Sequence, residues 1–173
     1  RLYDLGCSLG ASTLAMRQNL RSEDCHIVAV DNSPAMLERC RSIIDTDTHD
    51  TPVELLCANL EDVAIEDASV VVLNFTLQFI PLAVRDEVIQ RIYAGLRPGG
   101  VMVLSEKVTF EDPHLDEGAA AYFDVSGKHN FASMVIFRPS DIGLLSKGFL
   151  GFSFSRLRPK GARVSTSKGT ASG

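Results

Sequence analysis

The chain has 173 residues, 45% of them hydrophobic, with a formal net charge of −5. This length suits one domain with a sizeable core, and no apolar run approaches the roughly 18 residues that a membrane span needs. No charged-then-apolar leader precedes the first strand, so we predict a cytoplasmic protein that does not contact a membrane. Its four cysteines form no C-x-x-C pair and have no His cluster beside them, which predicts no metal site.

Charge divides the chain into two parts. Residues 1–112 are acidic, whereas residues 113–173 are basic and contain no acid after Asp141. Residues 113–173 hold few basic residues, so we expect no direct nucleic-acid binding. We predict an α/β domain over residues 1–112 and a divergent segment over 113–173 that is disordered or frameshifted. Because residue 1 already belongs to a predicted strand, we interpret the chain as truncated at its N-terminus.

The first half alternates between strands and helices. Residues 1–5 read as a strand, followed by a Gly-containing turn and a helix over residues 14–20. A second strand over residues 26–30 ends on Asp31. Ser33 can then cap a helix that has Pro34 in its first turn and runs to about Ile44.

The same alternation continues to residue 105. Residues 53–57 form the third predicted strand, and the β-branched run at residues 69–73 forms a fourth, buried on both faces. A helix over residues 82–96 is broken by the Arg-Pro-Gly-Gly turn at 97–100, and the fifth strand covers residues 101–105. This order predicts a mostly parallel sheet with helices on both faces.

Two glycines and an acid point to a nucleotide site. Gly6 and Gly10 lie in the turn after the first strand, and Asp31 follows about 20 residues later, where such folds hold a ribose diol. The dinucleotide pattern G-x-G-x-x-G is absent; the pattern is D-x-G-x-x-x-G, beginning at Asp4. The alternative is a Gly-rich turn that only connects packed elements.

Polar residues also follow the third and fourth strands, at Asn59 and Asn74. The carboxyl ends of parallel strands meet at one edge, so we expect these residues to share a pocket with Gly6 and Asp31. Asp4 is expected to hold the glycine turn. Phe75 and Phe79 are either core or pocket wall, and Glu106 lies at the edge of the site or is a solvated acid at a strand end.

Residues 2–112 resemble the carboxy-S-adenosyl-L-methionine (carboxy-SAM) synthase family of class I S-adenosylmethionine (SAM)-dependent methyltransferases. The matching text is YDLGCSLG at 3–10, DNSPAM at 31–36, VVLNFTLQF at 71–79, LSEK at 104–107 and FED at 110–112. We cannot align residues 113–173 with the family. The resemblance implies a Rossmann-like class I methyltransferase fold.

The resemblance also implies an activity. The family converts SAM and prephenate to carboxy-SAM and phenylpyruvate, which serves modification of the wobble uridine of transfer RNA, and it forms homodimers. No catalytic side chain is assigned. The implied cofactor-binding residues are Gly6, Cys7 and Ser8 on the methionine and ribose side, Asp31 at the ribose diol, Asn32, Asn59 and Leu60 around the adenine, and Asn74 facing the sulfonium.

Two other functions remain open from the sequence. One is an ordinary SAM-dependent methyltransferase acting on RNA or a small molecule. The other is an inactive fragment that retains only the nucleotide-binding edge. The spacing of the glycines disfavours a nicotinamide-dependent dehydrogenase.

Overall fold

The computed structural model describes residues 1–20, 24–107 and 132–137. Three α-helices, two 3₁₀ turns and six strands occur in these ranges. In chain order they are β1 Leu2–Leu5, α1 Ala11–Asn19, β2 Ile27–Asp31, α2 Pro34–Ile44, β3 Val53–Cys57, η1 Leu60–Asp62, β4 Ala68–Asn74, η2 Leu77–Phe79, α3 Leu82–Gly95, β5 Leu96–Lys107 and β6 Ala132–Phe137.

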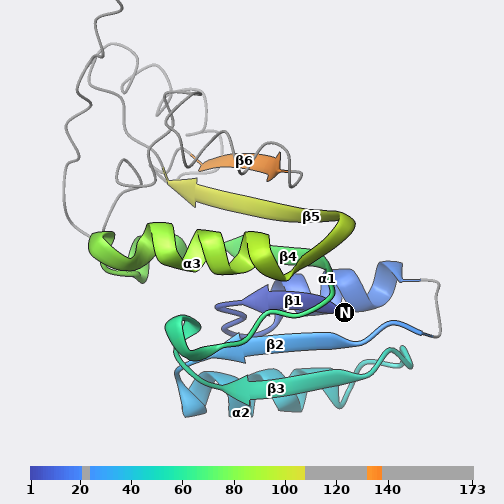
Figure 1. Cartoon of the computed structure of the whole chain (residues 1–173). Helices are drawn as coiled ribbons and strands as arrows, with labels where there is room; N and C mark the ends of the chain where they lie inside the picture. The colour runs from blue at the N-terminus through green and yellow to red at the C-terminus, as the bar shows by residue number, and fades with distance from the viewer. Residues whose placement is uncertain (21–23, 108–131, 138–173) are drawn as a thin grey trace, which may run out of the picture.

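The six strands form one sheet in the order β3-β2-β1-β4-β5-β6 (Figure 1). The first five are parallel, and β6 runs antiparallel to β5. The predicted mostly parallel sheet is therefore confirmed. Because β1 pairs with both β2 and β4, the strand order reverses at β1. This reversal opens a crevice at the carboxyl ends of the strands, where ligands bind in open α/β sheets.

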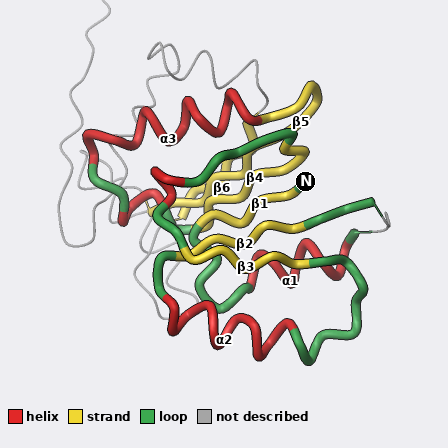
Figure 2. The backbone as a smooth tube through the Cα atoms, turned by 60° about the horizontal axis from the view of Figure 1, so that its bottom comes forward, coloured by secondary structure: helices red, strands yellow, loops and turns green. Residues whose placement is uncertain are grey.

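Helices cover both faces of the sheet, as predicted. Figure 2 shows α1 and α2 on one side and α3 on the other. Alternate residues of one strand serve the two faces, since Val28 and Val30 belong to the large core cluster that also includes α3, whereas Ala29 packs with Leu37 of α2.

Two predicted element boundaries reflect local chemistry. The Ser33 side chain accepts a hydrogen bond from Met36 N at 3.4 Å, and Pro34 begins α2, which confirms the predicted cap. The predicted start of the last parallel strand, residue 101, is wrong. Leu96 already pairs with Ala68, and an irregular register follows it, so β5 includes the Arg-Pro-Gly-Gly turn.

The predicted boundary at residue 112 lies outside the described residues, as does most of the segment 113–173. Within that segment, Ala132–Phe137 forms β6, which pairs with β5 from Met102 to Lys107. No helix in the described ranges is long and apolar enough to cross a membrane.

Candidate functional site

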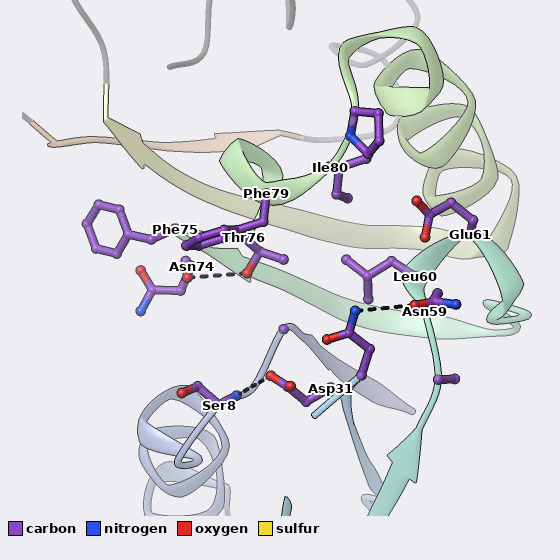
Figure 3. Close-up of a pocket in the computed structure, with 14 residues that line it drawn as sticks. Ser8, Asp31, Asn59, Leu60, Glu61, Asn74, Phe75, Thr76, Phe79 and Ile80 are labelled. Carbon is purple, nitrogen blue, oxygen red and sulfur yellow. Dashed lines mark hydrogen bonds between the residues drawn. The ribbon is translucent and has the colours of Figure 1, made fainter. Parts of the chain in front are cut away.

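A pocket of about 600 Å³ lies at the carboxyl ends of β1, β2, β3 and β4. Figure 3 shows Ser8 and Asp31 at its bottom, Asn59, Leu60 and Glu61 to one side, and Phe79 and Ile80 above them. Seven of the eight sequence-predicted site residues line this pocket. They are Gly6, Ser8, Asp31, Asn32, Asn59, Leu60 and Asn74.

The glycine turn contains three residues with positive φ, which are Gly6, Ser8 and Gly10. Gly6 has φ +79°, and a Cβ there would come within 2.5 Å of Thr76 Oγ1. Gly10 has φ +85° and precedes the first residue of α1. An L side chain is strained at both positions, so glycine allows the turn to pass close to Thr76 and then enter the helix. This geometry also explains why α1 begins at Ala11, earlier than predicted.

Asp31 sits at the tip of β2 with both carboxylate oxygens engaged by backbone. Oδ2 accepts from Ser8 N and Oδ1 accepts from Ser33 N, each at 2.9 Å. The side chain thus ties the glycine turn to the start of α2. Because each carboxylate oxygen has two acceptor sites, one on each oxygen is left for a ligand. A ribose diol supplies two donors spaced for such a pair.

The buried side chains of Asp4 and Cys7 stabilise the glycine turn. Asp4 is buried, accepts from Thr13 Oγ1 at 2.5 Å, and its pKa is raised by burial. It therefore holds the turn, as predicted. Cys7 is the predicted site residue that does not line the pocket, because its side chain is buried against Ala29 and Leu37. Burial raises the pKa of its thiol far above the ordinary range, so Cys7 is not a nucleophile and only its backbone is available.

A chain of amide hydrogen bonds joins the loops after β2 and β3. Asn32 Nδ2 donates to Asn59 Oδ1 at 3.2 Å, and Asn59 Nδ2 donates to Asp62 Oδ2 at 3.3 Å. Leu60 lies in the same short turn and lines the pocket. This side therefore combines exposed amides with one apolar surface, a combination that suits a flat heterocycle.

The loop after β4 forms the opposite side. Asn74 is exposed and donates to Ser12 Oγ at 3.3 Å, so it bridges β4 and α1 rather than capping loop amides. Phe75 follows with φ +56°, a strained conformation for a bulky residue. Its N–H donates to Ser105 O at 2.7 Å, which anchors the strained residue to β5.

The sequence did not assign several pocket residues. Phe75 and Phe79 prove to be pocket wall, and Phe79 is 64% exposed. The other unassigned residues are Ala58, Glu61, Thr76, Ile80 and Pro81. Only their position in the sequence could have indicated them, since all of them follow a strand whose carboxyl end lies at the pocket.

The alternative prediction that Glu106 is a solvated acid at a strand end is wrong. Its side chain is 1% exposed and accepts a hydrogen bond from Leu77 N at 2.5 Å. Burial raises its pKa to about 7, although hydrogen bonding from backbone amides and the charge of Arg85 oppose the shift. It does not line the pocket.

The charges of the pocket favour a cationic ligand. Asp31 and Glu61 line it, and none of the described lining residues is Lys, Arg or His. A pyrophosphate would meet like charge there, whereas a sulfonium or an ammonium group would meet opposite charge. Within the described ranges no cluster of three or more His, Cys, Asp or Glu residues could hold a metal ion.

Comparison with known proteins identifies the class. The family model for a methyltransferase domain matches residues 2–100, and the chain therefore belongs to that family. Its fold is the class I methyltransferase fold. The cyclopropane synthase MmaA2 from Mycobacterium tuberculosis superposes with a TM-score of 0.57 at 20% identity, over 68% of this chain and 40% of that one.

Sequence relatives narrow the resemblance. A carboxy-S-adenosyl-L-methionine synthase from Citrifermentans bemidjiense is 58% identical over 130 residues, which is 75% of this chain and 51% of the relative. One from Trichlorobacter lovleyi is 63% identical over 112 residues, which is 64% of this chain and 46% of the relative. The chain thus spans about half the length of these curated relatives, and the predicted resemblance to carboxy-SAM synthases is confirmed over that span.

Proposed function

We propose that this chain binds S-adenosyl-L-methionine in the pocket at the strand ends. In this proposal Asp31 accepts from the ribose diol, Asn32, Asn59 and Leu60 surround the adenine, and Asn74 faces the sulfonium. The backbone of residues 6–8 contacts the methionine and ribose. The observation that carries the proposal is Asp31, whose two oxygens each keep an acceptor site beside the glycine turn.

We further propose that the activity is carboxy-SAM synthesis, with prephenate as the carboxyl donor and phenylpyruvate as the product. Prephenate releases carbon dioxide and hydroxide, the methyl carbon of SAM loses a proton to that hydroxide, and the resulting ylide bonds to the carbon dioxide. This chemistry needs enclosure and orientation more than a side-chain nucleophile. The identity to carboxy-SAM synthases supports it.

The remaining functional expectations belong to the same proposal. They are that carboxy-SAM from this reaction serves the wobble-uridine modification of transfer RNA, that the protein acts as a homodimer in the cytoplasm, and that it does not itself bind nucleic acid. The names of the relatives support only the product on which the first of these depends, carboxy-SAM.

The test is calorimetric titration of the purified chain with SAM and with carboxy-SAM. It is followed by incubation with SAM plus prephenate and detection of carboxy-SAM by mass spectrometry. Asp31→Ala is the control, because it removes the proposed ribose ligand. Binding of SAM with formation of carboxy-SAM supports the proposal. Binding without that product retains SAM recognition and removes the synthase activity, and absence of binding to either compound removes both.

A further inference from the structure

Residues 75–81 form the pocket side that follows β4, here named the 75–81 wall. Five of its residues line the pocket: Phe75, Thr76, Phe79, Ile80 and Pro81. Its regular structure is the single 3₁₀ turn η2, Leu77–Phe79. Such a short turn does not hold its shape by itself, so the contacts that fix it must come from elsewhere in the fold.

Glu106 supplies the first of these contacts. It reaches the wall from β5, is 1% exposed, and its Oε1 accepts from Leu77 N at 2.5 Å. The backbone N–H groups of Thr76 and Gln78 also lower its pKa, so consecutive amides of the wall face the carboxylate. An ionised carboxylate only accepts hydrogen bonds, which makes it a suitable partner for a group of donors.

Arg85 supplies the complementary contact from α3. It too is 1% exposed, and its Nε donates to Ile80 O at 2.9 Å while Nη2 donates to Gln78 O at 3.4 Å. A guanidinium only donates hydrogen bonds, so it suits the carbonyl groups of the wall. One buried carboxyl group therefore binds the amides of this turn, and one buried guanidinium binds its carbonyls.

A third contact connects the wall to the glycine turn. Thr76 Oγ1 donates to Leu5 O at 2.8 Å, and the same Oγ1 would lie 2.5 Å from a Cβ on Gly6. Neither Glu106 nor Arg85 lines the pocket, so neither can touch a ligand there. Burying two charged side chains costs several kcal/mol per ion before their interactions are counted. Stability alone is thus a poor reason for the pair, whereas a fixed wall beside the pocket is a good one.

We propose that Glu106 and Arg85 are positioning residues that fix the 75–81 wall and thereby set how tightly the pocket holds the sulfonium and amino-acid end of its ligand. The inference rests on the proposed function for the identity of that ligand. The adenosyl end lies mainly against Asp31, Asn32 and Asn59 in that proposal, so its binding should be less sensitive to the pair.

The experiment compares two ligands and two variants. SAM carries the adenosyl group, the charged sulfur and the amino acid, whereas 5′-methylthioadenosine lacks the amino acid and the charge. Glu106→Gln leaves one oxygen instead of two to accept from the backbone donors of the wall, and Arg85→Lys cannot donate to two carbonyls in fixed geometry. Each variant should lower the affinity for SAM by about 10-fold, while the affinity for methylthioadenosine changes by less than about 2-fold. Amides 77–80 should exchange faster with solvent, with the amides of β2 unchanged.

Arg17→Lys is the matched control. Arg17 also donates to two carbonyls, Thr51 O at 2.9 Å and Ile44 O at 3.0 Å, but it lies away from the pocket. The Arg17→Lys substitution should leave the ratio of the SAM and methylthioadenosine affinities unchanged. Equal weakening of both ligands in Glu106→Gln and Arg85→Lys, or unchanged exchange of amides 77–80, would overturn the positioning role. If the unmodified chain binds neither ligand, the proposed function fails and the amide exchange alone decides this inference.

Discussion

The two sides of the pocket are built on opposite principles. The side around Asp31 is held by hydrogen bonds among exposed or half-exposed groups, such as Ser8 N to Asp31 and Asn32 to Asn59. The 75–81 wall is held by three buried side chains, Glu106, Arg85 and Thr76. The first side presents its polar groups to the pocket, and the second uses its polar groups on its own backbone and presents mainly apolar side chains. In the proposed function, hydrogen bonding and shape are thus contributed by different loops of one sheet edge.

Gly6→Ala should have the largest effect, because Gly6 is where the two sides meet. The substitution adds positive-φ strain and a Cβ within 2.5 Å of Thr76 Oγ1. Together these should lower the free energy of unfolding by about 3 kcal/mol. Urea denaturation followed by circular dichroism measures the change. The control is Gly99→Ala, which has φ +82° with nothing within 4 Å and isolates the strain. Equal losses in the two variants would contradict close contact between the sides.

Glu106 should give the stability of the buried side a dependence on pH. Its pKa is raised from 4.5 to about 7, so the folded state holds this proton more tightly than the unfolded state. The resulting stabilisation is complete below pH 4.5 and is lost as the pH rises through about 7. Relative to Glu106→Gln, the unmodified chain should therefore lose about 3 kcal/mol between these limits.

Denaturation of both proteins at a series of pH values measures that difference. Because it is the change with pH that is compared, a constant cost of the substitution cancels. A difference that stays flat across this range would mean that Glu106 keeps an ordinary pKa.

Asp31→Asn tests the exposed side. The amide keeps one acceptor oxygen but replaces the other with a donor that faces Ser8 N or Ser33 N. SAM affinity should fall about 10- to 30-fold, as expected for loss of a hydrogen bond to a charged group. Calorimetric titration provides the measurement. The exchange rates of amides 77–80 should not change, and faster exchange there would show that the two sides are not independent.

Phe75→Asn should have the smallest effect on stability. Asparagine tolerates the positive φ of this position, which offsets the lost contacts of a half-buried ring, so the free energy of unfolding should stay within about 1 kcal/mol. SAM affinity should still fall about 5-fold, because the ring is part of the apolar wall. Unchanged affinity would remove Phe75 from the wall's function.

The exposed side was predictable from sequence because its signals are local. Strand ends, the Ser33 cap and the spacing of Gly6 to Asp31 are all read from short stretches, and the predicted bounds of β3 agree with the structure. The predicted burial of the fourth strand on both faces was only partly right. Val71 and Leu73 are buried, but Val70 and Val72 are only partly buried.

The buried side was not predictable for the opposite reason. Arg85 interrupts the apolar face expected from Val84, Val88 and Ile92, and a lone Arg in a helix reads as solvent-facing. Glu106 at a strand end reads the same way. Both side chains are buried against backbone groups of the same turn. Arg85 bonds to Gln78, seven residues away, and Glu106 bonds to Leu77, 29 residues away, so no local sequence pattern predicts that the three segments come together.

The central position of β1 has a consequence for how the chain folds. Leu2 pairs with Ile27 on one edge and with Val70 on the other, so β1 is synthesised well before the strand that completes its pairing. Pairing of β1 with β4 closes a long loop, and contacts between residues that are distant in the sequence slow folding. While the ribosome is still adding β4, the apolar edge of β1 stays unpaired and open to wrong partners. Pulsed hydrogen exchange during refolding should therefore protect the amides of β1 and β4 in the same kinetic step.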